Sequence, residues 1–348
     1  MNATVGLIAN PAAGRDIRRL TAHASIVPNH EKAAIVRRVL HGVAAAGVDL
    51  VMYLADNAGI VAAAVDGGTP PVPMDALPHR AHGLASDSTE AARLLAAAGV
   101  GVIVTLGGDG TNRAVAAGCG DVPLVAVSTG TNNVVPTMVD GTVAGLAAGL
   151  LAAGAVPAER VAPRSKRVEV TAGGITDFAL IDAAACVDTF VGARAIWDPG
   201  RVEALVLTRA APWSVGLSAI GGQLDAVGPD EPAALYVELG PGRVRGTSTG
   251  CLGGSGHEVI ATIAPGVVAR VAVAGWRRLP LGEPVSLGAG ARTVALDGER
   301  ELLIHDSEAT ALVTRTGPRV VDIQATLRAA AASGATREGW LAGVRRDR

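Results

Sequence analysis

The sequence predicts an α/β domain built on a parallel sheet, then a β-rich, sandwich-like domain, with a C-terminal segment returning to the first domain. Two observations support this fold class. Up to about residue 155, short strands that are apolar throughout alternate with alanine-rich helical patterns, typical of a parallel sheet covered on both faces. After about residue 165, short β-type runs are punctuated by Gly and Asp. We therefore expect domains at 1–160 and 161–322, and a helical segment at 323–348 that packs on the first domain.

The elements of the first domain follow from apolar periodicity and from helix and turn signals. Residues 66–79 are rich in Gly and Pro and are predicted to form a loop. Ser86 or Ser88, ahead of Glu90, is typical of a capped helix start. The strands are expected at 4–10, 49–55, 101–108 and 122–129, and the helices at 31–46, 58–65, 86–99 and from near Thr111.

The second domain is predicted from β-type runs, and the end of the chain from helical periodicity. The domain begins after a junction at 156–162, and residues 326–347 are predicted to be helical. The β-type runs lie at 166–188, 201–209, 233–239 and 291–321.

Composition and charge indicate a soluble globular protein. The 348 residues are 49% hydrophobic and carry a formal net charge of −2, so we expect neither nucleic acid nor a membrane as a partner. Cys119, Cys186 and Cys251 are widely spaced and odd in number, which argues against a disulfide framework and favours a reducing compartment. The N-terminal MNATVGLIAN has no basic n-region, and the longest apolar stretch, 143–157, is too short to span a bilayer. We therefore expect a cytoplasmic protein.

Several nucleotide- and metal-binding motifs are absent from the sequence. Neither Lys32 nor Lys166, the two lysines of the chain, follows a glycine, so there is no GxxxxGK[ST] P-loop. GxGxxG, HExxH and CxxC are also absent, which removes the dinucleotide fingerprint and leaves no evident zinc site. GTSTG at 246–250 has the formal GxSxG pattern, but it lacks the preceding strand and following helix, so we interpret it as a glycine-rich loop.

The stretch VIVTLGGDGTN, residues 102–112, carries a strand directly into Gly-Gly-Asp-Gly-Thr. In open α/β folds the turn after a parallel strand lies at the edge of the sheet where ligands bind. Its glycines allow a bulky anion to approach the backbone, and the N-terminus of the next helix favours phosphate. Beside a phosphate, Asp109 would bind a cation, orient a hydroxyl or remove its proton. Alternatively, Asp109 caps the helix expected to begin near Thr111.

Two further polar turns follow strands of the same predicted sheet. VAVSTGTNNVVP at 125–136 ends in hydroxyl and amide side chains, and NPAAGRD at 10–16 supplies Arg15 for a phosphate. Because parallel strands end at the same edge, we expect these turns to converge with the turn that contains Asp109. Three such turns predict a site for a nucleotide triphosphate without a P-loop lysine.

Asn29, His30, Glu31 and Lys32 cluster at the start of the helix expected at 31–46. One interpretation is a capped, solvated first turn of that helix. The alternative is that the cluster contacts a phosphate or the acceptor of a reaction.

These residues resemble a known superfamily. The run from Gly107 to Thr111 matches the GGDGT signature of the NAD kinase and diacylglycerol kinase superfamily, which combines an α/β domain with a β-rich domain and has its active site in the cleft. Within it, the chain resembles especially the acetoin-catabolism protein X group, described as ATP-NAD kinase-like. The stretches that carry this similarity are 6–20, 29–40, 107–116, 128–136 and 188–199.

The resemblance implies transfer of the γ-phosphoryl group of ATP to a hydroxyl, with Mg²⁺ as a cofactor that neutralises charge. Asp109 is then the candidate catalytic base or orienting group. Asp182 is a candidate for holding a ribose hydroxyl, and Asp297 or Glu299 is a second candidate carboxylate, unless DGER at 297–300 is simply a hairpin turn. The remaining nucleotide-binding candidates are Asn10, Gly14, Arg15, Gly107, Gly108, Gly110, Thr111, Asn112, Thr129, Gly130, Thr131, Asn132 and Asn133.

Departures from the family pattern bear on the phosphoryl acceptor. ALIDAAACVD at 179–188 lacks the Asn-Glu pair with which NAD kinases grip the dinucleotide, and no aromatic or aliphatic excess suggests a lipid tunnel. We expect NAD(H) or a related small molecule as the acceptor. The alternatives are another small alcohol linked to acetoin catabolism, or a regulator that binds nucleotide without transferring phosphate. The family also implies a homo-oligomer.

Overall fold

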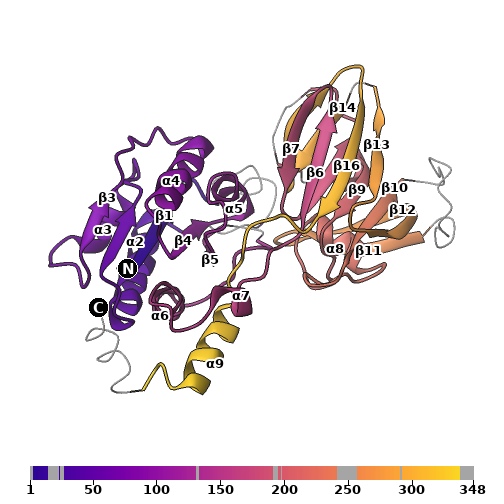
Figure 1. Ribbon diagram of the computed structural model, residues 1–348. Helices are drawn as coiled ribbons and strands as arrows, with labels where there is room; N and C mark the ends of the chain where they lie inside the picture. Colours follow the sequence, from indigo (N-terminus) through magenta and orange to yellow (C-terminus); the bar gives the residue numbers. More distant parts are fainter. Residues whose placement is uncertain are drawn as a thin grey trace. The chain divides into compact units, whose positions relative to one another are not determined.

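Figure 1 shows the computed structural model of the chain. The structure describes residues 3–14, 23, 27–130, 133–190, 195–196, 198–240, 257–290 and 292–337. The chain divides into two compact units. The first holds the described residues of Met1–Gly14, Ile26–Arg164 and Pro318–Arg348, and the second those of Arg15–Ser25 and Ser165–Gly317.

The first unit is an α/β domain on a parallel sheet, as predicted. Its strands are β1 (Thr4–Ala9), β2 (Leu50–Tyr53), β3 (Met74–Ala76), β4 (Val102–Gly107) and β5 (Leu124–Ser128). The strand order β3–β2–β1–β4–β5 means that the sheet grows outward in both directions from the pair β1 and β4. These two strands are paired in parallel from Val5 opposite Val102 to Ala9 opposite Leu106.

Helices cover both faces of this sheet, because its strands carry apolar side chains on both sides (Figure 1). The helices are α2 (Asn29–Ala45), α3 (Ile60–Val65), α4 (Ala85–Ala97), α5 (Asp109–Ala116), α6 (Gly141–Ala152), α7 (Ala158–Val161) and α9 (Ile323–Ser333). On one face, α2, α3 and α6 share a core with Val104. On the other, Leu95 of α4 and Val115 of α5 pack with Ile103. In the described part of the chain, no helix has the length and apolar character needed to cross a membrane.

Two local expectations in this unit are wrong. The loop predicted at 66–79 contains β3, a strand of only 3 residues that pairs with β2 at the edge of the sheet, where flanking prolines are tolerated. Helix α4 is not capped by Ser86 or Ser88. Instead, the carboxylate of Asp87 accepts hydrogen bonds from the three backbone amides just before the helix. A carboxylate has more acceptor sites than a hydroxyl, so this one side chain serves all three amides.

The second unit is β-rich and sandwich-like, also as predicted. Its antiparallel sheets have the orders β11–β12–β10–β9–β8–β14–β15 and β13–β16–β6–β7. Val168 and Val313 of the smaller sheet share one hydrophobic core with Val206 and Val294 of the larger. The elements are β6 (Arg167–Ala172), β7 (Ile175–Ala179), β8 (Asp182–Cys186), a 3-10 helix (Pro199–Arg201), β9 (Val202–Leu207), α8 (Leu217–Gly222), β10 (Ala233–Leu239), β11 (His257–Ala264), β12 (Val267–Pro280), β13 (Pro284–Ala289), β14 (Arg292–Leu296), β15 (Glu299–Ile304) and β16 (Glu308–Thr314).

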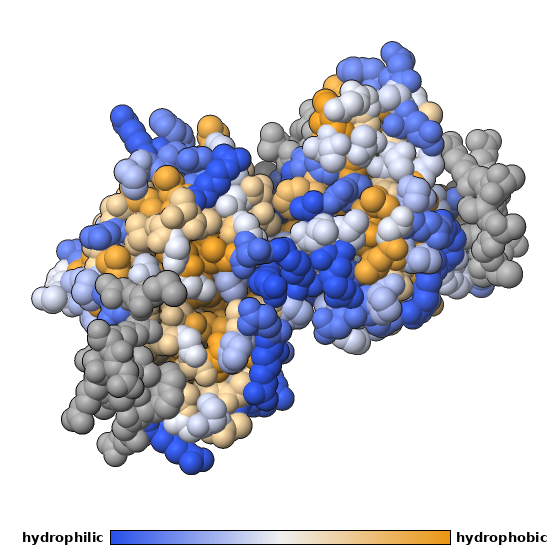
Figure 2. Space-filling model, in the orientation of Figure 1, coloured by the Kyte–Doolittle hydropathy of each residue, from blue (hydrophilic) through white to orange (hydrophobic). Residues whose placement is uncertain are grey.

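After β16 the chain returns to the first unit, as the sequence predicts. The backbone amide of Leu124 in β5 donates a 2.8 Å hydrogen bond to the carbonyl of Arg319, and α9 then packs on α6. The exposed positions of α9 include alanines as well as Gln324 and Arg328, and Figure 2 shows hydrophilic and hydrophobic residues mixed on this face of the first unit. Gly334, at φ +80°, ends α9, so the helix predicted at 326–347 is interrupted there, and residues 338–348 lie outside the described part.

Candidate functional site

The site predicted from the sequence lies where the direction of sheet growth changes. Strands β1 and β4 are neighbours there, although β1 is followed by β2 and β4 by β5 on opposite sides (Figure 1). The turn after β1 therefore lies beside the turn after β4, and the amide of Asn10 donates a 2.9 Å hydrogen bond to the carbonyl of Leu106. Ligands of open α/β folds bind at this point, outside the carboxyl ends of the strands.

Asn10 connects the two turns through its side chain. Its amide nitrogen donates a 2.8 Å hydrogen bond to the hydroxyl of Thr111 in the first turn of α5. Its side-chain oxygen accepts a 2.8 Å hydrogen bond from the amide of Ala12, which folds the chain tightly behind β1. Gly14 follows at φ +80° in the left-handed region. The predicted phosphate ligand Arg15 lies outside the described residues.

Lys32, in the first helical turn of α2, holds the loop that follows β1. Its ammonium donates hydrogen bonds of 3.0 to 3.1 Å to the carbonyls of Asn10, Pro11 and Ala13. Lys32 is fully buried, at 0% exposure, so the expectation of a solvated first turn is wrong for this residue. Glu31 is exposed and pairs with Arg38 at 3.1 Å, as a solvated turn would require. The sequence around Lys32 does not indicate that the turn at residues 10–13 will cover this side chain.

Asp109 is the first residue of α5, which begins close to Thr111, as predicted. Its carboxylate accepts hydrogen bonds of 2.8 to 3.1 Å from the amides of Val134 and Val135. The interpretation of Asp109 as the cap of α5 is therefore wrong, because this carboxylate bonds to the chain segment after β5. Asp109 links the turn after β4 to the turn after β5, and it is half-buried.

Asn112 is buried and fixes the glycine turn after β4 through its side chain. Its side-chain amide donates a 2.9 Å hydrogen bond to the carbonyl of Gly108, and its side-chain oxygen accepts a 2.7 Å hydrogen bond from the hydroxyl of Thr105. Asn112 is 0% exposed, so in this structure it shapes the glycine turn and has no surface for a ligand.

The glycine turns after β4 and β5 approach each other closely. A Cβ atom on Gly130 would lie 2.9 Å from the Cα atom of Gly108 and 2.6 Å from the side-chain oxygen of Asn133. Asn133 is itself held by a 2.6 Å hydrogen bond from its side-chain amide to the hydroxyl of Ser128. Gly130 is therefore needed for the two turns to meet at this distance, whereas a Cβ atom on Gly108 would lie 3.7 Å from the Cα atom of Gly130, an ordinary contact distance.

Thr129 offers an unbonded hydroxyl, and Gly110 leaves room beside the backbone, at this edge of the sheet. The amide of Thr129 donates a 3.1 Å hydrogen bond to the carbonyl of Gly107, but its buried hydroxyl has no hydrogen-bond partner among the described residues. Gly107 is required at its position, because a Cβ atom there would lie 2.4 Å from the Cβ atom of Thr111. A Cβ atom on Gly110 would meet no atom of the described residues within 4 Å. Thr131 and Asn132, both predicted to line the site, lie outside the described residues.

The candidate carboxylates of the second unit lie at the β14–β15 turn. Asp297, at φ +51°, and Gly298, at φ +73°, form this turn, so DGER at 297–300 is a hairpin turn that also places two carboxylates. The carboxylate of Asp297 accepts hydrogen bonds of 2.7 to 3.1 Å from the amides of Leu180 and Ile181. The buried carboxylate of Asp182 accepts a 3.1 Å hydrogen bond from the amide of Gly298.

Glu299 begins β15 directly after this turn and is half-buried. The second unit thus brings Asp182, Asp297 and Glu299 together around one hairpin turn. Across the described residues, no group of three or more His, Cys, Asp or Glu side chains is arranged to hold a metal ion.

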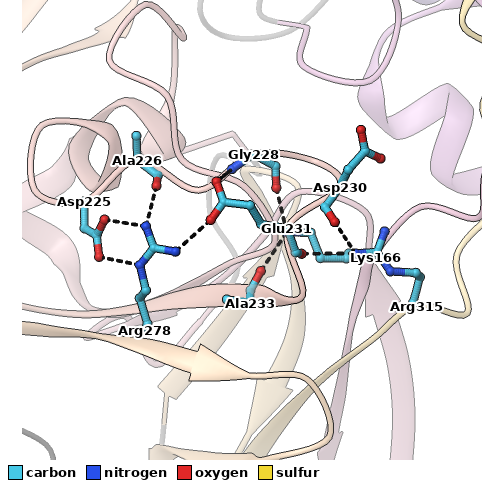
Figure 3. A network of polar contacts seen from close by, with 9 residues as sticks. All are labelled: Lys166, Asp225, Ala226, Gly228, Asp230, Glu231, Ala233, Arg278 and Arg315. Carbon is cyan, nitrogen blue, oxygen red and sulfur yellow. Dashed lines mark hydrogen bonds and ion pairs between the residues drawn. The ribbon is translucent and has the colours of Figure 1, made fainter.

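Lys166 is a second buried lysine, and the sequence predicted no role for it. Its ammonium donates hydrogen bonds of 2.8 and 2.7 Å to the carbonyls of Gly228 and Ala233, at the two ends of the loop before β10 (Figure 3). Burial lowers the pKa of Lys166 to about 8. Arg278 holds the same loop from the other side through ion pairs with Asp225 and Glu231 (Figure 3). This network stabilises the loop in the second unit.

Both units match known protein families. Residues 5–155 match a family model described as the ATP-NAD kinase N-terminal domain. Residues 166–316 match a model described as the acetoin catabolism protein X C-terminal domain. A curated relative, acetoin catabolism protein X from Cupriavidus necator, is 38% identical over 340 residues, which cover 93% of this chain and 91% of the relative. The likeness to this relative therefore spans both units.

Two solved structures from Bacillus anthracis, each described as a "putative diacylglycerol kinase", also align with the chain. Their TM-scores are 0.43 and 0.41, at 14% and 15% sequence identity. The alignments cover 92% of this chain in both cases, and 97% and 99% of the two solved chains.

Proposed function

The chain belongs to the acetoin catabolism protein X family, and from this premise we propose that it is an ATP-dependent kinase. It would transfer the γ-phosphoryl group to a hydroxyl of NAD(H) or of a related small molecule. One observation carries the proposal: the turns after β1, β4 and β5 are joined by the hydrogen bonds of Asn10 to Thr111 and of Asp109 to Val134 and Val135. The match of residues 5–155 to the ATP-NAD kinase N-terminal domain supports the same activity.

The phosphate groups of ATP would bind at the first turn of α5 and the turn after β1. The first amides of a helix have no partner within the helix, and the helix dipole favours negative charge there. Gly110 leaves open space at this turn, and the buried hydroxyl of Thr129 lacks a partner among the described residues. Both features fit a phosphate ligand. The proposed nucleotide-binding residues are Asn10, Gly14, Arg15, Gly107, Gly108, Gly110, Thr111, Thr129, Gly130, Thr131, Asn132 and Asn133, with Asn112 bracing the turn.

Mg²⁺ fits this donor set although the described residues form no cluster of metal ligands. In such enzymes Mg²⁺ is held by one or two carboxylates together with the phosphates of the substrate, and Asp109 supplies one carboxylate at the right edge of the sheet. Bound Mg²⁺ would neutralise charge on the phosphates. Asp109 itself would orient the acceptor hydroxyl or take its proton.

The proposal for the acceptor rests on the families that the two units match. The ATP-NAD kinase match of the first unit favours NAD(H), with Asp182 as the residue that holds a ribose hydroxyl and Asp297 or Glu299 as a further carboxylate. The second unit matches the acetoin catabolism protein X domain instead, which favours a different small alcohol as the second candidate. A nucleotide-binding regulator without transfer activity is the third.

Two measurements on the wild-type protein test the proposal. Calorimetric titration with ATP in the presence of Mg²⁺ is expected to show binding to one site per chain. Addition of NAD, NADH or acetoin to the ATP-loaded protein is then expected to release ADP with one of the three. Binding of ATP without release of ADP in any mixture would contradict kinase activity toward these acceptors and favour the regulator.

A further inference from the structure

Lys32 carries a charge that the fold encloses completely. Lysine is almost never fully buried unless its ammonium is paired, because taking a charge out of water is costly. Lys32 is 0% exposed, and the groups that receive its hydrogen bonds include three carbonyls of one short turn, those of Asn10, Pro11 and Ala13. Lys166 holds a loop of the second unit in a similar way, but the turn held by Lys32 follows β1 at the candidate site.

The turn held by Lys32 is connected directly to the start of α5. Asn10 receives the ammonium of Lys32 on its backbone carbonyl and donates from its side chain to the hydroxyl of Thr111. The path from Lys32 through Asn10 to Thr111 therefore consists of two hydrogen bonds, of 3.0 and 2.8 Å. A change at Lys32 would be transmitted to both turns that are proposed to contact phosphate.

The charge of Lys32 also acts at a distance. Electrostatic interactions are screened weakly in a protein interior, so a buried ammonium attracts an anion on the far side of a turn without contacting it. A neutral side chain of the same length would fill the same volume but would provide no such attraction.

We propose that Lys32 is a positioning residue for the phosphate groups of the nucleotide, acting through the carbonyls of residues 10–13 and through its charge. This inference rests on the proposed function. It predicts that removing the charge weakens binding in proportion to the phosphates of the ligand. ATP would lose most affinity, AMP less and adenosine least.

The two lysines of the chain allow a test on the wild-type protein. Both are buried and donate to backbone carbonyls, but Lys166 holds a loop of the second unit. Labelling with isotope-enriched lysine gives two side-chain NMR signals, which the variants Lys32→Met and Lys166→Met assign. We expect ATP to shift the Lys32 signal and adenosine to leave it in place, with Lys166 unmoved by either. Binding of ATP, detected by calorimetry, with no shift at Lys32 would overturn the inference.

The same variants provide the binding test. Lys32→Met is expected to weaken ATP binding by about tenfold or more, because the turn loses its support and the phosphates lose the attraction of the buried charge, and to change adenosine binding little. Lys166→Met is the matched control and is expected to bind both ligands as the wild type does. Equal losses for ATP and adenosine would overturn the inference. If Lys32→Met does not fold, the NMR measurement on the wild type still decides. Failure of the wild type to bind ATP at all would instead overturn the proposed function, and the inference with it.

Discussion

The side-chain amide of Asn10 donates a 2.8 Å hydrogen bond to the hydroxyl of Thr111. The two residues are 101 positions apart in the chain, and they meet because β1 and β4 are neighbours at the point where sheet growth changes direction. This contact sets the spacing between the turn after β1 and the first turn of α5, the two backbone segments that we propose to contact phosphate.

Replacing Asn10 is expected to damage both stability and binding. Asn10→Ala removes the hydrogen bonds to Thr111 and from Ala12, which should lower the free energy of unfolding by about 1–3 kcal/mol. Thr111→Val removes only the first of these bonds and should cost less. Urea denaturation measures the stability, and titration with ATP measures the binding. ATP affinity unchanged in Asn10→Ala would show that the turn after β1 takes no part in the site.

Asp109→Asn is expected to remove turnover while the fold is retained. The asparagine keeps one side-chain oxygen to accept from the amides of Val134 and Val135, but it cannot take a proton and binds a cation poorly. We expect the rate of ADP formation to fall by about 10²- to 10⁴-fold. The circular dichroism spectrum should stay close to that of the wild type. An unchanged rate would remove Asp109 from the reaction.

Two glycine variants separate effects on binding from effects on folding. Gly110→Ala places a methyl group in open space at the start of a helix, so stability should stay the same or rise by about 0.5–1 kcal/mol. ATP binding should nevertheless weaken, because the methyl group occupies the place proposed for phosphate. Gly110→Ala with normal ATP affinity would mean that no phosphate lies against this turn.

Gly130→Ala is the second glycine variant, and it is expected to destabilise the fold. Its Cβ atom would lie 2.9 Å from the Cα atom of Gly108, which is backbone and cannot move aside easily. We expect a loss of about 1–3 kcal/mol in the free energy of unfolding, as is usual for overpacking. Thermal denaturation of the two variants side by side provides the comparison. A Gly130→Ala protein as stable as Gly110→Ala would contradict the close approach of the two turns.

Lys166 gives the second unit a specific dependence on pH. Burial lowers its pKa to about 8 in the folded protein, whereas the ordinary value for lysine is 10.5. Between these two pH values the unfolded chain binds more protons than the folded one, so stability rises with pH. Below about pH 8 both states are protonated and the contribution of Lys166 is constant.

The comparison of wild type with Lys166→Met isolates this effect from other titrating groups. The free energy of unfolding of the wild type, relative to that of the variant, is expected to increase as the pH is raised from 8 toward 10.5. Denaturant titrations at several pH values in this interval measure it. A difference that stays constant across the interval would mean that the pKa of Lys166 is not lowered in the folded state.

The fold class and the meeting of the three polar turns at one edge of the sheet were predictable because they depend on local patterns. The apolar runs that became β1, β4 and β5 each end in a small or polar turn, and the physics of parallel sheets brings such turns to one edge. The partners of Asp109 were not predictable in the same way. Its donors are the backbone amides of Val134 and Val135, and an amide is present at every non-proline position.

The roles of two charged residues, Lys32 and Asp87, were also not predicted from the sequence. Lys32 follows polar residues at a helix start and is therefore typical of a solvated turn, but the turn after β1 lies against it. Asp87 sits inside the helix that it caps, three residues after the position where a capping hydroxyl is usually sought. The error at Lys32 arises because burial is set by tertiary packing, which local periodicity does not report. The error at Asp87 is local, because its carboxylate bonds to amides only three to five residues earlier.

Mass spectrometry of reaction mixtures tests the central claim most directly. The wild-type protein is incubated with Mg²⁺-ATP and NAD, NADH or acetoin in turn, with Asp109→Asn as the control. The account predicts ADP together with one product heavier than its acceptor by a phosphoryl group, formed by the wild type alone. Unchanged masses of all three acceptors in the presence of bound ATP would contradict phosphoryl transfer to them.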